Sequence, residues 1–309
     1  MNILKRIIDI IQKEQLGKLI FHKSLKKATA IGIGGYAEYW FEPYNQTSLI
    51  KVVKELNKNN LKYFIIGNGS NILFSDESFK TLFISLKNLN DIIFNKDSVT
   101  IQAGSNAVRS GLTLAKKGYR NFIYMALIPG TIGGLIYMNA SSYNMGVIDS
   151  LLEVHYLTSF GEVKKLLITD RVKTLFTYRK SFFTNTNNII LAGVFRLEKM
   201  DSIKVLEQIA YYKNQKSLNQ PLNYRSIGST FRNFNEIKAW ELIDSVGLRG
   251  FRIGDAAVSR KHTNFLINYN SASFEEMISL IKLVKTKVKE ETGYELMLEP
   301  LIITTKIID

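Results

Sequence analysis

Apolar residues recur along the chain with two different spacings, which predict helices in some segments and strands in others. One face of a predicted helix carries Leu49, Val52, Val53 and Leu56, which lie about one helical turn apart. The apolar runs at 62–66 and 72–74 predict two buried strands, with the polar loop GNGSN between them. Helices and strands alternate in this way along the chain, so the sequence predicts a mixed α+β fold.

Further elements are predicted in the second half of the chain. Residues 153–168 carry β-forming residues on both sides of a Ser-Phe-Gly turn and predict a hairpin. Ser273 and Glu276 form a capping box that begins a helix, and Gly293 ends it. Residues 295–303 predict a last strand.

The uncharged segment 121–148 is long enough to cross a bilayer, but its residues argue against a spanning helix. Pro129, Gly130, Gly133 and Gly134 lie in its middle, where they would break such a helix. The N-terminus is amphipathic and carries charges that interrupt any signal-peptide core. We therefore expect a soluble, cytoplasmic protein that does not bind a membrane.

Composition and charge narrow the functional classes. The chain has 309 residues, a formal net charge of +14 and no cysteine, which excludes disulfides, thiolate metal sites and a cysteine nucleophile. The positive charge favours anionic ligands, but no basic cluster with interleaved aromatic residues indicates nucleic-acid binding. His22, His155 and His262 show no metal-ligand spacing, so no metal site is expected.

Two glycine-rich loops are candidates for binding a phosphorylated cofactor. GNGSN (67–71) and IPGTIGG (128–134) are each expected to follow an apolar strand. Backbone amides in such loops can bind anions, and the side chains of Ser70 and Asn71 add donors. The first loop lacks the dinucleotide-binding fingerprint, because no helix with three spaced glycines opens from it. Together the loops suit a ligand with two phosphates and a flat ring.

Six ordered motifs make the chain similar to one enzyme family. They are TAIGIGGYAEYWFEP (29–43), IGNGSNILFSD (66–76), IPGTIGGLIYMNASSY (128–143), YRKSFF (178–183), GSTFRN (228–233) and LIDSVGLRGFRIGDAAVSRKHTNFLIN (242–268). In this order they resemble the UDP-N-acetylenolpyruvoylglucosamine reductase (MurB) family, in its shorter type II form. The resemblance implies a two-lobed FAD-binding module of the vanillyl-alcohol-oxidase type, followed by a smaller α+β substrate domain.

The resemblance also implies a domain division and a set of ligands. The FAD module would span 1–200, with its lobes divided near 86–90, and the substrate domain would span 201–309, with a last strand that can rejoin the first lobe. NADPH would donate hydride, UDP-N-acetylglucosamine enolpyruvate would accept it, and no obligatory protein partner is expected. The residues expected to bind FAD are Gly67, Asn68, Gly69, Ser70, Asn71, Pro129, Gly130, Thr131, Gly133, Gly134 and Asn139.

The same resemblance suggests the residues that act on the substrate. Arg179 would pair with the enolpyruvyl carboxylate, and Ser229 would donate a proton to the carbanion. Tyr178, Tyr224 and Asn233 are expected to contact the sugar nucleotide. Taken without the family, Arg179 is typical of a surface ion pair, Ser229 of a turn, and the other three of packing or turns.

The chain departs from the family pattern near its C-terminus. Leu301 stands where the family has its third catalytic residue, a glutamate, and Ile303 stands where the family often has a basic residue. Asn219 and Phe234 also replace the usual lysine and proline. If residues 295–303 form one strand, Glu299 shares a face with Leu301. We therefore hypothesise that Glu299 replaces the missing glutamate, the alternative being a solvated charge at the end of a strand.

Two other functions remain open from the sequence. A different flavin-dependent oxidoreductase, acting on an alcohol or a sugar, would share the FAD module. The residues Arg179 and Ser229 argue against it, as does the absence of a histidine near the two loops for covalent flavin attachment. A non-catalytic or altered-substrate flavin-binding relative of the reductase is favoured by Leu301 and Ile303.

Overall fold

The chain passes repeatedly between two units, each of which is assembled from separate segments. A computed structural model describes residues 3–234 and 236–309. Unit 1 comprises 1–21, 39–68 and 81–213, and unit 2 comprises 22–38, 69–80 and 214–309. Residues that are distant in sequence therefore share a unit, whereas neighbouring residues such as Asn68 and Gly69 fall in different ones.

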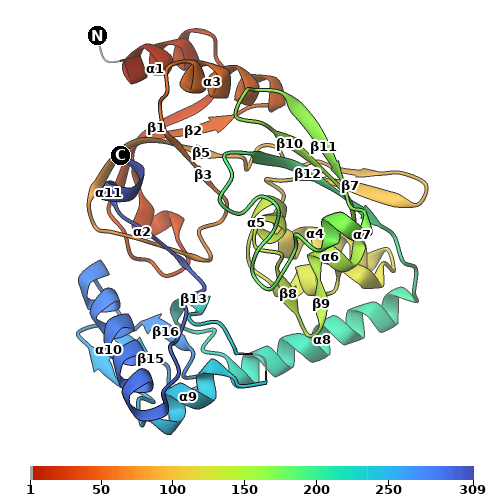
Figure 1. The fold of residues 1–309 in the computed structure, drawn as a ribbon. Coiled ribbons are helices and arrows are strands. Elements are labelled where there is room, and N and C mark those ends of the chain that lie inside the picture. Colours follow the sequence, from red (N-terminus) through yellow and green to blue (C-terminus); the bar gives the residue numbers. More distant parts are fainter. Residues whose placement is uncertain (1–2, 235) are drawn as a thin grey trace. The chain divides into compact units, whose positions relative to one another are not determined.

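A four-stranded sheet has the order β1-β2-β5-β3. Its strands are β1 (Gly17–Ser24), β2 (Tyr36–Pro43), β5 (Ser78–Ser85) and β3 (Tyr63–Ile66). β3 runs parallel to β5, with Tyr63 opposite Leu82 and Ile66 opposite Ser85. The two helices α1 (Ile3–Lys13) and α3 (Gln46–Lys58) lie together beside this sheet (Figure 1). Asn45 caps α3, because its side chain accepts a hydrogen bond from the Ser48 amide at 2.9 Å.

A second sheet in unit 1 has five antiparallel strands in the order β11-β10-β12-β7-β6. The strands are β6 (Ile92–Phe94), β7 (Ser98–Gln102), β10 (Leu151–Leu157), β11 (Val163–Leu167) and β12 (Ile189–Arg196). β10 and β11 form the hairpin that the sequence predicts over 153–168. Alternate residues of β7, Val99 and Ile101, point into the core, which is the pattern of a strand with one buried face.

The remaining elements of unit 1 are mostly short helices. They are α4 (Ala107–Lys116), η1 (Arg120–Phe122), η2 (Tyr124–Leu127), α5 (Ile132–Tyr137), α6 (Val147–Ser150) and α7 (Asp170–Lys173), with the small hairpin β8 (Ser141–Ser142) and β9 (Met145–Gly146). The longer α8 (Ser202–Asn219) belongs to unit 1 as far as Lys213. One apolar core joins α1, α3 and α5 to both sheets. Because burial of apolar surface is the main favourable contribution to folding, this core fixes the scaffold from which the loops of unit 1 project.

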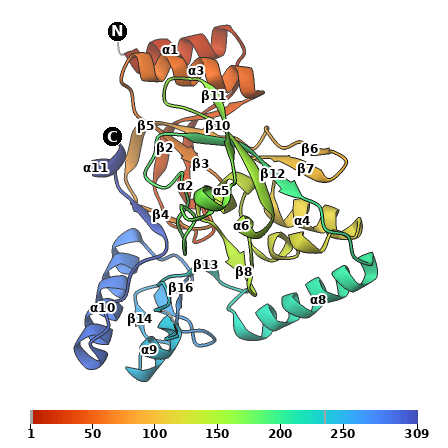
Figure 2. The same cartoon turned by 45° about the vertical axis from the view of Figure 1, so that its right-hand side comes forward.

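Unit 2 has its own core and a four-stranded antiparallel sheet of order β13-β16-β15-β14. The strands are β13 (Arg225–Ser229), β14 (Arg252–Ile253), β15 (Ala256–Val258) and β16 (Phe265–Asn268). α9 (Ala239–Ser245) and α10 (Phe274–Thr292) lie along this sheet (Figure 2). α10 begins at the predicted capping box and ends at Gly293, whose φ of 76° is left-handed, so both predicted ends are confirmed. The short helices α2 (Leu25–Ala28) and α11 (Thr305–Ile308) complete the unit.

The predicted strand over 295–303 is too long. Regular strand geometry is confined to β17 (Leu301–Ile303), which pairs in parallel with β4 (Ile72–Phe74). Leu298 makes only an isolated bridge to Phe231. The buried Pro300 lies between these two pairings, and proline has no amide hydrogen to donate to a ladder. The segment therefore changes partners at Pro300 instead of continuing as one strand.

Candidate active site

The loop Gly67–Asn71 connects β3 to β4, as the sequence predicts. Gly69 has a left-handed φ of 59°, and its carbonyl accepts a hydrogen bond from the Ala30 amide at 3.0 Å. A Cβ at Gly69 would lie 2.4 Å from the Ala28 carbonyl oxygen. Glycine is therefore needed here for both the backbone conformation and the close packing.

The loop IPGTIGG is preceded by the 3₁₀ helix η2, so the predicted strand before it is wrong. All four residues of η2 are buried, and a buried helical turn cannot be distinguished from a buried strand by its apolar run. Thr131 caps α5, because its hydroxyl accepts a hydrogen bond from the Gly134 amide at 3.3 Å. The Gly133 amide donates to the Ala103 carbonyl at 2.9 Å, which holds the loop against the end of β7.

The two glycine-rich loops meet within unit 1. A Cβ at Gly67 would lie 2.7 Å from the Thr131 hydroxyl oxygen, closer than a side chain can pack. The bare backbone of Gly67 thus faces the residue that begins α5. The absence of a side chain at Gly67 thus lets the two loops pack against each other. Backbone amides of such loops can bind the phosphates of a dinucleotide, so this arrangement fits FAD.

Arg179 lies in a tight turn that the end of α5 holds in place. Thr177 and Lys180 exchange two backbone hydrogen bonds, of 3.0 and 3.2 Å, around Tyr178 and Arg179. Arg179 has a left-handed φ of 59°, and its guanidinium carbon lies 4.9 Å from the centre of the Tyr178 ring. The side chain of Asn139 donates to the Thr177 carbonyl at 3.0 Å. Asn139, Tyr178 and Arg179 are thereby brought together.

A further anchor of this turn lies one residue beyond Lys180. The hydroxyl of Ser181 donates to the Tyr137 carbonyl at 2.8 Å, at the end of α5. The same hydroxyl accepts a hydrogen bond from the Phe183 amide at 3.2 Å. The helix that opens from IPGTIGG is therefore connected directly to the turn that carries Arg179.

Ser229 is the last residue of β13 and lies opposite Phe265 of β16. The register between these strands shifts between Ser226 and Ser229, where Gly228 has a φ of 77°. Such irregularities redirect the side chain that follows them and are frequent beside active sites. Ser229 is half-buried.

Glu299 lies beside the segment that carries Ser229. The Glu299 amide donates to the Thr230 carbonyl at 3.0 Å, and the Asn71 side chain donates to the Glu299 carbonyl at 3.3 Å. The Leu301 amide in turn donates to the Asn71 carbonyl at 3.0 Å. Ser229, Glu299 and Asn71 are thus brought together within unit 2. The argument that Glu299 and Leu301 share one strand face is wrong, because Glu299 precedes β17.

Two predicted substrate contacts have structural partners in unit 2. Tyr224 stacks on Tyr269, with ring centres 5.5 Å apart and an interplanar angle of 23°. The guanidinium carbon of Arg252 lies 4.0 Å from the centre of the Tyr269 ring. The side-chain oxygen of Asn233 accepts a hydrogen bond from the Ala239 amide at 3.0 Å, at the start of α9. Tyr269 and Arg252 were missed in the sequence, which offers no periodic signal that pairs them with Tyr224.

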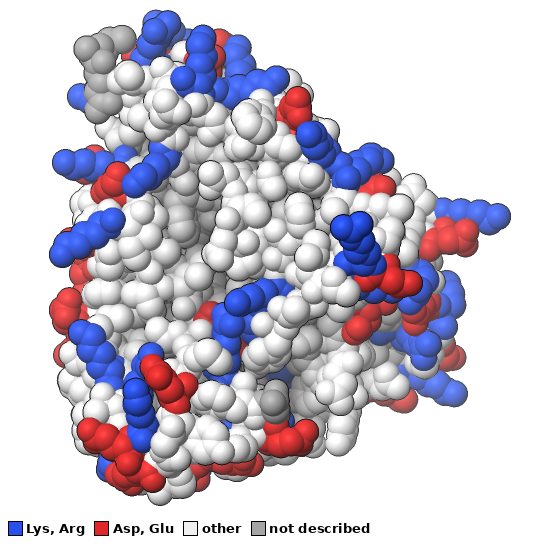
Figure 3. Space-filling view, in the orientation of Figure 1, with Lys and Arg blue, Asp and Glu red and all other residues white. Residues whose placement is uncertain are grey.

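Charged side chains of both signs are interspersed on the face drawn in Figure 3. His155 pairs with Glu153, and His262 lies between Trp240 and Phe265. Across 3–234 and 236–309, no three or more His, Cys, Asp or Glu residues form a group able to hold a metal. Within the same ranges no helix is long and apolar enough to cross a membrane.

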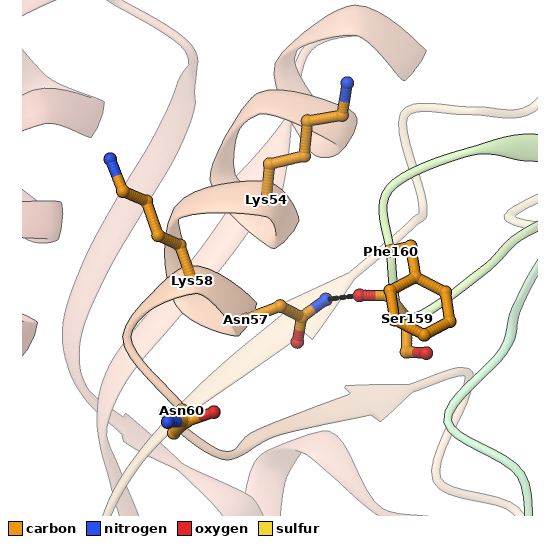
Figure 4. Close-up of a pocket in the computed structure, with 6 residues that line it drawn as sticks. All are labelled: Lys54, Asn57, Lys58, Asn60, Ser159 and Phe160. Carbon is orange, nitrogen blue, oxygen red and sulfur yellow. Dashed lines mark hydrogen bonds between the residues drawn. The ribbon is translucent and has the colours of Figure 1, made fainter.

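A surface pocket in unit 1 has a lining distinct from the predicted site residues. It is lined by Lys54, Asn57, Lys58, Asn60, Ser159 and Phe160 (Figure 4). The Asn57 side chain donates to the Ser159 carbonyl at 2.6 Å, so the pocket joins the end of α3 to the turn of the β10–β11 hairpin. None of the residues that line this pocket was predicted to bind cofactor or substrate.

Two segments of the chain match known protein families. Residues 37–167 match the family described as FAD binding domain, and residues 220–303 match the C-terminal domain of UDP-N-acetylenolpyruvoylglucosamine reductase. The reductase of Caldanaerobacter subterraneus is 31% identical over 94% of this chain and 95% of its own length. That of Streptococcus thermophilus is 31% identical over 97% of this chain and 98% of its own.

A solved structure extends the similarity to the fold. The crystal structure of UDP-N-acetylenolpyruvylglucosamine reductase from Thermus caldophilus has a TM-score of 0.77 and 25% sequence identity. The match covers 93% of this chain and 98% of that one. The predicted α+β class and the presence of an FAD-binding module are confirmed.

Proposed function

Because the chain belongs to the UDP-N-acetylenolpyruvoylglucosamine reductase family, we propose that it reduces UDP-N-acetylglucosamine enolpyruvate to UDP-N-acetylmuramate with electrons from NADPH. The chain is an FAD-containing oxidoreductase. The observation that carries the proposal is the similarity to named reductases over nearly the full chain. The product would serve peptidoglycan synthesis in the cytoplasm, with residues 1–200 holding the cofactor and 201–309 binding the substrate.

The two glycine-rich loops would hold FAD, and the close approach of Gly67 to Thr131 supports this assignment. FAD held there would supply the hydride-transfer chemistry that connects NADPH to the enolpyruvyl methylene carbon. Negative charge then develops on the carbon next to the substrate carboxylate. A protein group that stabilises this charge lowers the barrier to the reduction.

Arg179 is the proposed stabilising cation. Its guanidinium can pair with a carboxylate through two parallel hydrogen bonds, and it stays protonated throughout the physiological range. Its backbone is held in a left-handed turn by contacts to the end of α5. A strained conformation maintained by several contacts is typical of a functional residue.

Ser229 is the proposed proton donor to the carbanion, and Glu299 is proposed to assist it. A serine hydroxyl is a weak acid, so nearby groups must stabilise its conjugate base. The backbone bond from Glu299 to Thr230 places the glutamate next to the serine segment. Substitution of Glu299 by Gln should slow product formation while leaving flavin reduction by NADPH unchanged; unaltered turnover would exclude this role.

A second candidate function is that of a flavin-binding relative with an altered or lost second reaction. The observation in its favour is Leu301, which is 39% exposed and occupies the place of the family glutamate.

Anaerobic half-reactions separate the two proposals. The purified protein is reconstituted with FAD, treated with NADPH, and then mixed with UDP-N-acetylglucosamine enolpyruvate while the flavin absorbance is followed. Bleaching followed by recovery, with UDP-N-acetylmuramate as the product, is expected for the reductase. Bleaching without recovery would instead support the flavin-binding relative, and the absence of bleaching would contradict NADPH as the donor.

A further inference from the structure

A small hairpin next to the Arg179 turn supplies a contact that no sequence motif assigned. Ser141, at the start of β8, lies opposite Gly146 of β9. Its hydroxyl oxygen accepts a hydrogen bond from Nη1 of Arg179 at 3.1 Å. A Cβ at Gly146 would lie only 3.1 Å from the Cβ of Ser141, so the glycine leaves room for the serine side chain. The contact joins residues 38 positions apart in the chain.

The tip of this hairpin is fixed to α8. Tyr143 and Asn144 both have left-handed backbones, with φ of 53° and 59°, as a two-residue turn between antiparallel strands requires. Such a conformation is unfavourable for tyrosine and needs compensating contacts. The Tyr143 ring stacks on Tyr212 with centres 4.2 Å apart, and its hydroxyl donates to the Tyr212 carbonyl at 3.4 Å. Figure 1 shows β8 and β9 reaching to α8.

We propose that Ser141 is a positioning residue that orients the Arg179 guanidinium toward the substrate carboxylate, and that the stacking of Tyr143 on Tyr212 keeps the hairpin in place. This inference rests on the proposed function for the role of Arg179. A long arginine side chain on a turn has many rotamers, and each hydrogen bond to a fixed acceptor removes part of that freedom before substrate binds.

Ser141 can serve this role because its side chain is uncharged. A serine hydroxyl accepts one hydrogen bond from the guanidinium without cancelling its charge. An aspartate or glutamate at this position would form an ion pair with Arg179 and compete with the carboxylate of the substrate. Ser141 thus restricts the direction of the guanidinium while leaving its positive charge available to an anionic ligand.

The kinetic test compares substitutions at one position. We expect Ser141→Ala to lower kcat/KM for UDP-N-acetylglucosamine enolpyruvate roughly tenfold, as for the loss of a hydrogen bond to a charged group. Ser141→Thr, which keeps a hydroxyl, should recover most of this loss. Ser141→Asp should raise KM more than Ser141→Ala does, because its carboxylate competes with that of the substrate. The neighbouring Ser142→Ala is the matched control and should retain wild-type kinetics. Flavin reduction by NADPH, measured without the enolpyruvate substrate, should be unchanged in all four variants.

A chemical readout tests the contact in the FAD-loaded protein whether or not the proposed reaction occurs. Phenylglyoxal modifies accessible guanidinium groups, and the peptide that contains Arg179 can be quantified by mass spectrometry. We expect Ser141→Ala to be modified at Arg179 several times faster than the wild type, and Ser142→Ala to match the wild type. Tyr212→Ala should also accelerate modification, and Tyr212→Phe, which keeps the stacked ring, should not.

The outcomes separate the two claims. Equal modification rates in Ser141→Ala and the wild type would overturn the proposed contact. Faster modification with unchanged kcat/KM would overturn its role in orienting Arg179 for the reaction. If the wild type shows no turnover of the enolpyruvate substrate, the proposed function fails, and the modification rates still decide whether Ser141 orients Arg179.

Discussion

The turn that carries Arg179 and the strand that carries Ser229 are held by different kinds of interaction. Thr177 and Lys180 exchange backbone hydrogen bonds within the Arg179 turn, but the contacts that join this turn to other segments come from side chains, namely Asn139, Ser141 and Ser181. Around Ser229, backbone hydrogen bonds join Thr230 to Asn264 at 2.8 Å and to Glu299 at 3.0 Å, and the side chains of Thr230 and Asn264 add to this ladder. A backbone ladder survives most substitutions, whereas a loop held by side chains depends on each of them. The two proposed catalytic residues should therefore differ in their sensitivity to mutations around them.

The largest expected effect is the direct removal of the proposed proton donor. Ser229→Ala should slow the reduction of the enolpyruvate about 10²- to 10⁴-fold, the usual contribution of a positioned acid. Its fold should remain intact because the β13 backbone does not depend on this hydroxyl. Stopped-flow reoxidation of the flavin measures the effect, with flavin reduction by NADPH as the internal control. A reoxidation rate equal to that of the wild type would remove Ser229 from the mechanism.

The second prediction concerns the core beneath Ser229. Phe231 is 1% exposed in the core of unit 2 and is paired with Leu298. Phe231→Ala should lower the free energy of unfolding by about 3–5 kcal/mol, because it leaves a cavity in a packed core. Chemical denaturation measures this change, and Phe251→Ala is the control, since Phe251 is 39% exposed. If Phe231→Ala loses no more free energy of unfolding than Phe251→Ala, the Ser229 segment does not depend on this core.

The third prediction tests the dependence of the Arg179 turn on side chains. Ser181 is 6% exposed, and its replacement by Ala leaves the Tyr137 carbonyl without this donor. We expect Ser181→Ala to lower the free energy of unfolding by about 1–3 kcal/mol, and also to slow flavin reoxidation by the substrate. Thr186→Ala removes a comparable hydroxyl-to-carbonyl bond, to Phe183 at 3.0 Å, outside the turn. If Ser181→Ala lowers the free energy of unfolding but leaves flavin reoxidation unchanged, the side-chain contacts of the turn do not determine the reactivity that depends on Arg179.

The smallest effect is a pH dependence in unit 2. Burial lowers the pKa of His262 below its ordinary value of 6.5, and the nearby Arg249 acts in the same direction. The unfolded chain therefore binds a proton near pH 6.5 that the folded protein does not. As the pH falls below 6.5, the free energy of unfolding should decrease and then level off once the folded-state pKa is passed. His262→Phe should remove this component from denaturation curves measured between about pH 5.5 and 7.5, roughly one unit on either side of the ordinary histidine pKa. An unaltered slope would contradict the assignment.

Several local elements and the enzyme class can be predicted from the sequence alone. The capping box at Ser273 and Glu276 and the left-handed Gly293 bound α10 because their effects act within one helical turn. The GNGSN loop follows its predicted strand for the same local reason. The family motifs identified the enzyme class because their residues and order can be recognised without knowing their contacts.

Which distant residues meet depends on the folding of the whole chain. Nothing in the local pattern pairs Asn71 with Glu299, 228 positions away, or Ser141 with Arg179. The last strand is shorter than predicted because its partner β4 has three residues and Pro300 interrupts pairing on the other side. Local propensity depends on neighbours in sequence, whereas such contacts depend on how the whole chain buries its apolar surface. The sequence therefore identifies the candidate site residues, and the fold determines the contacts that hold each of them in place.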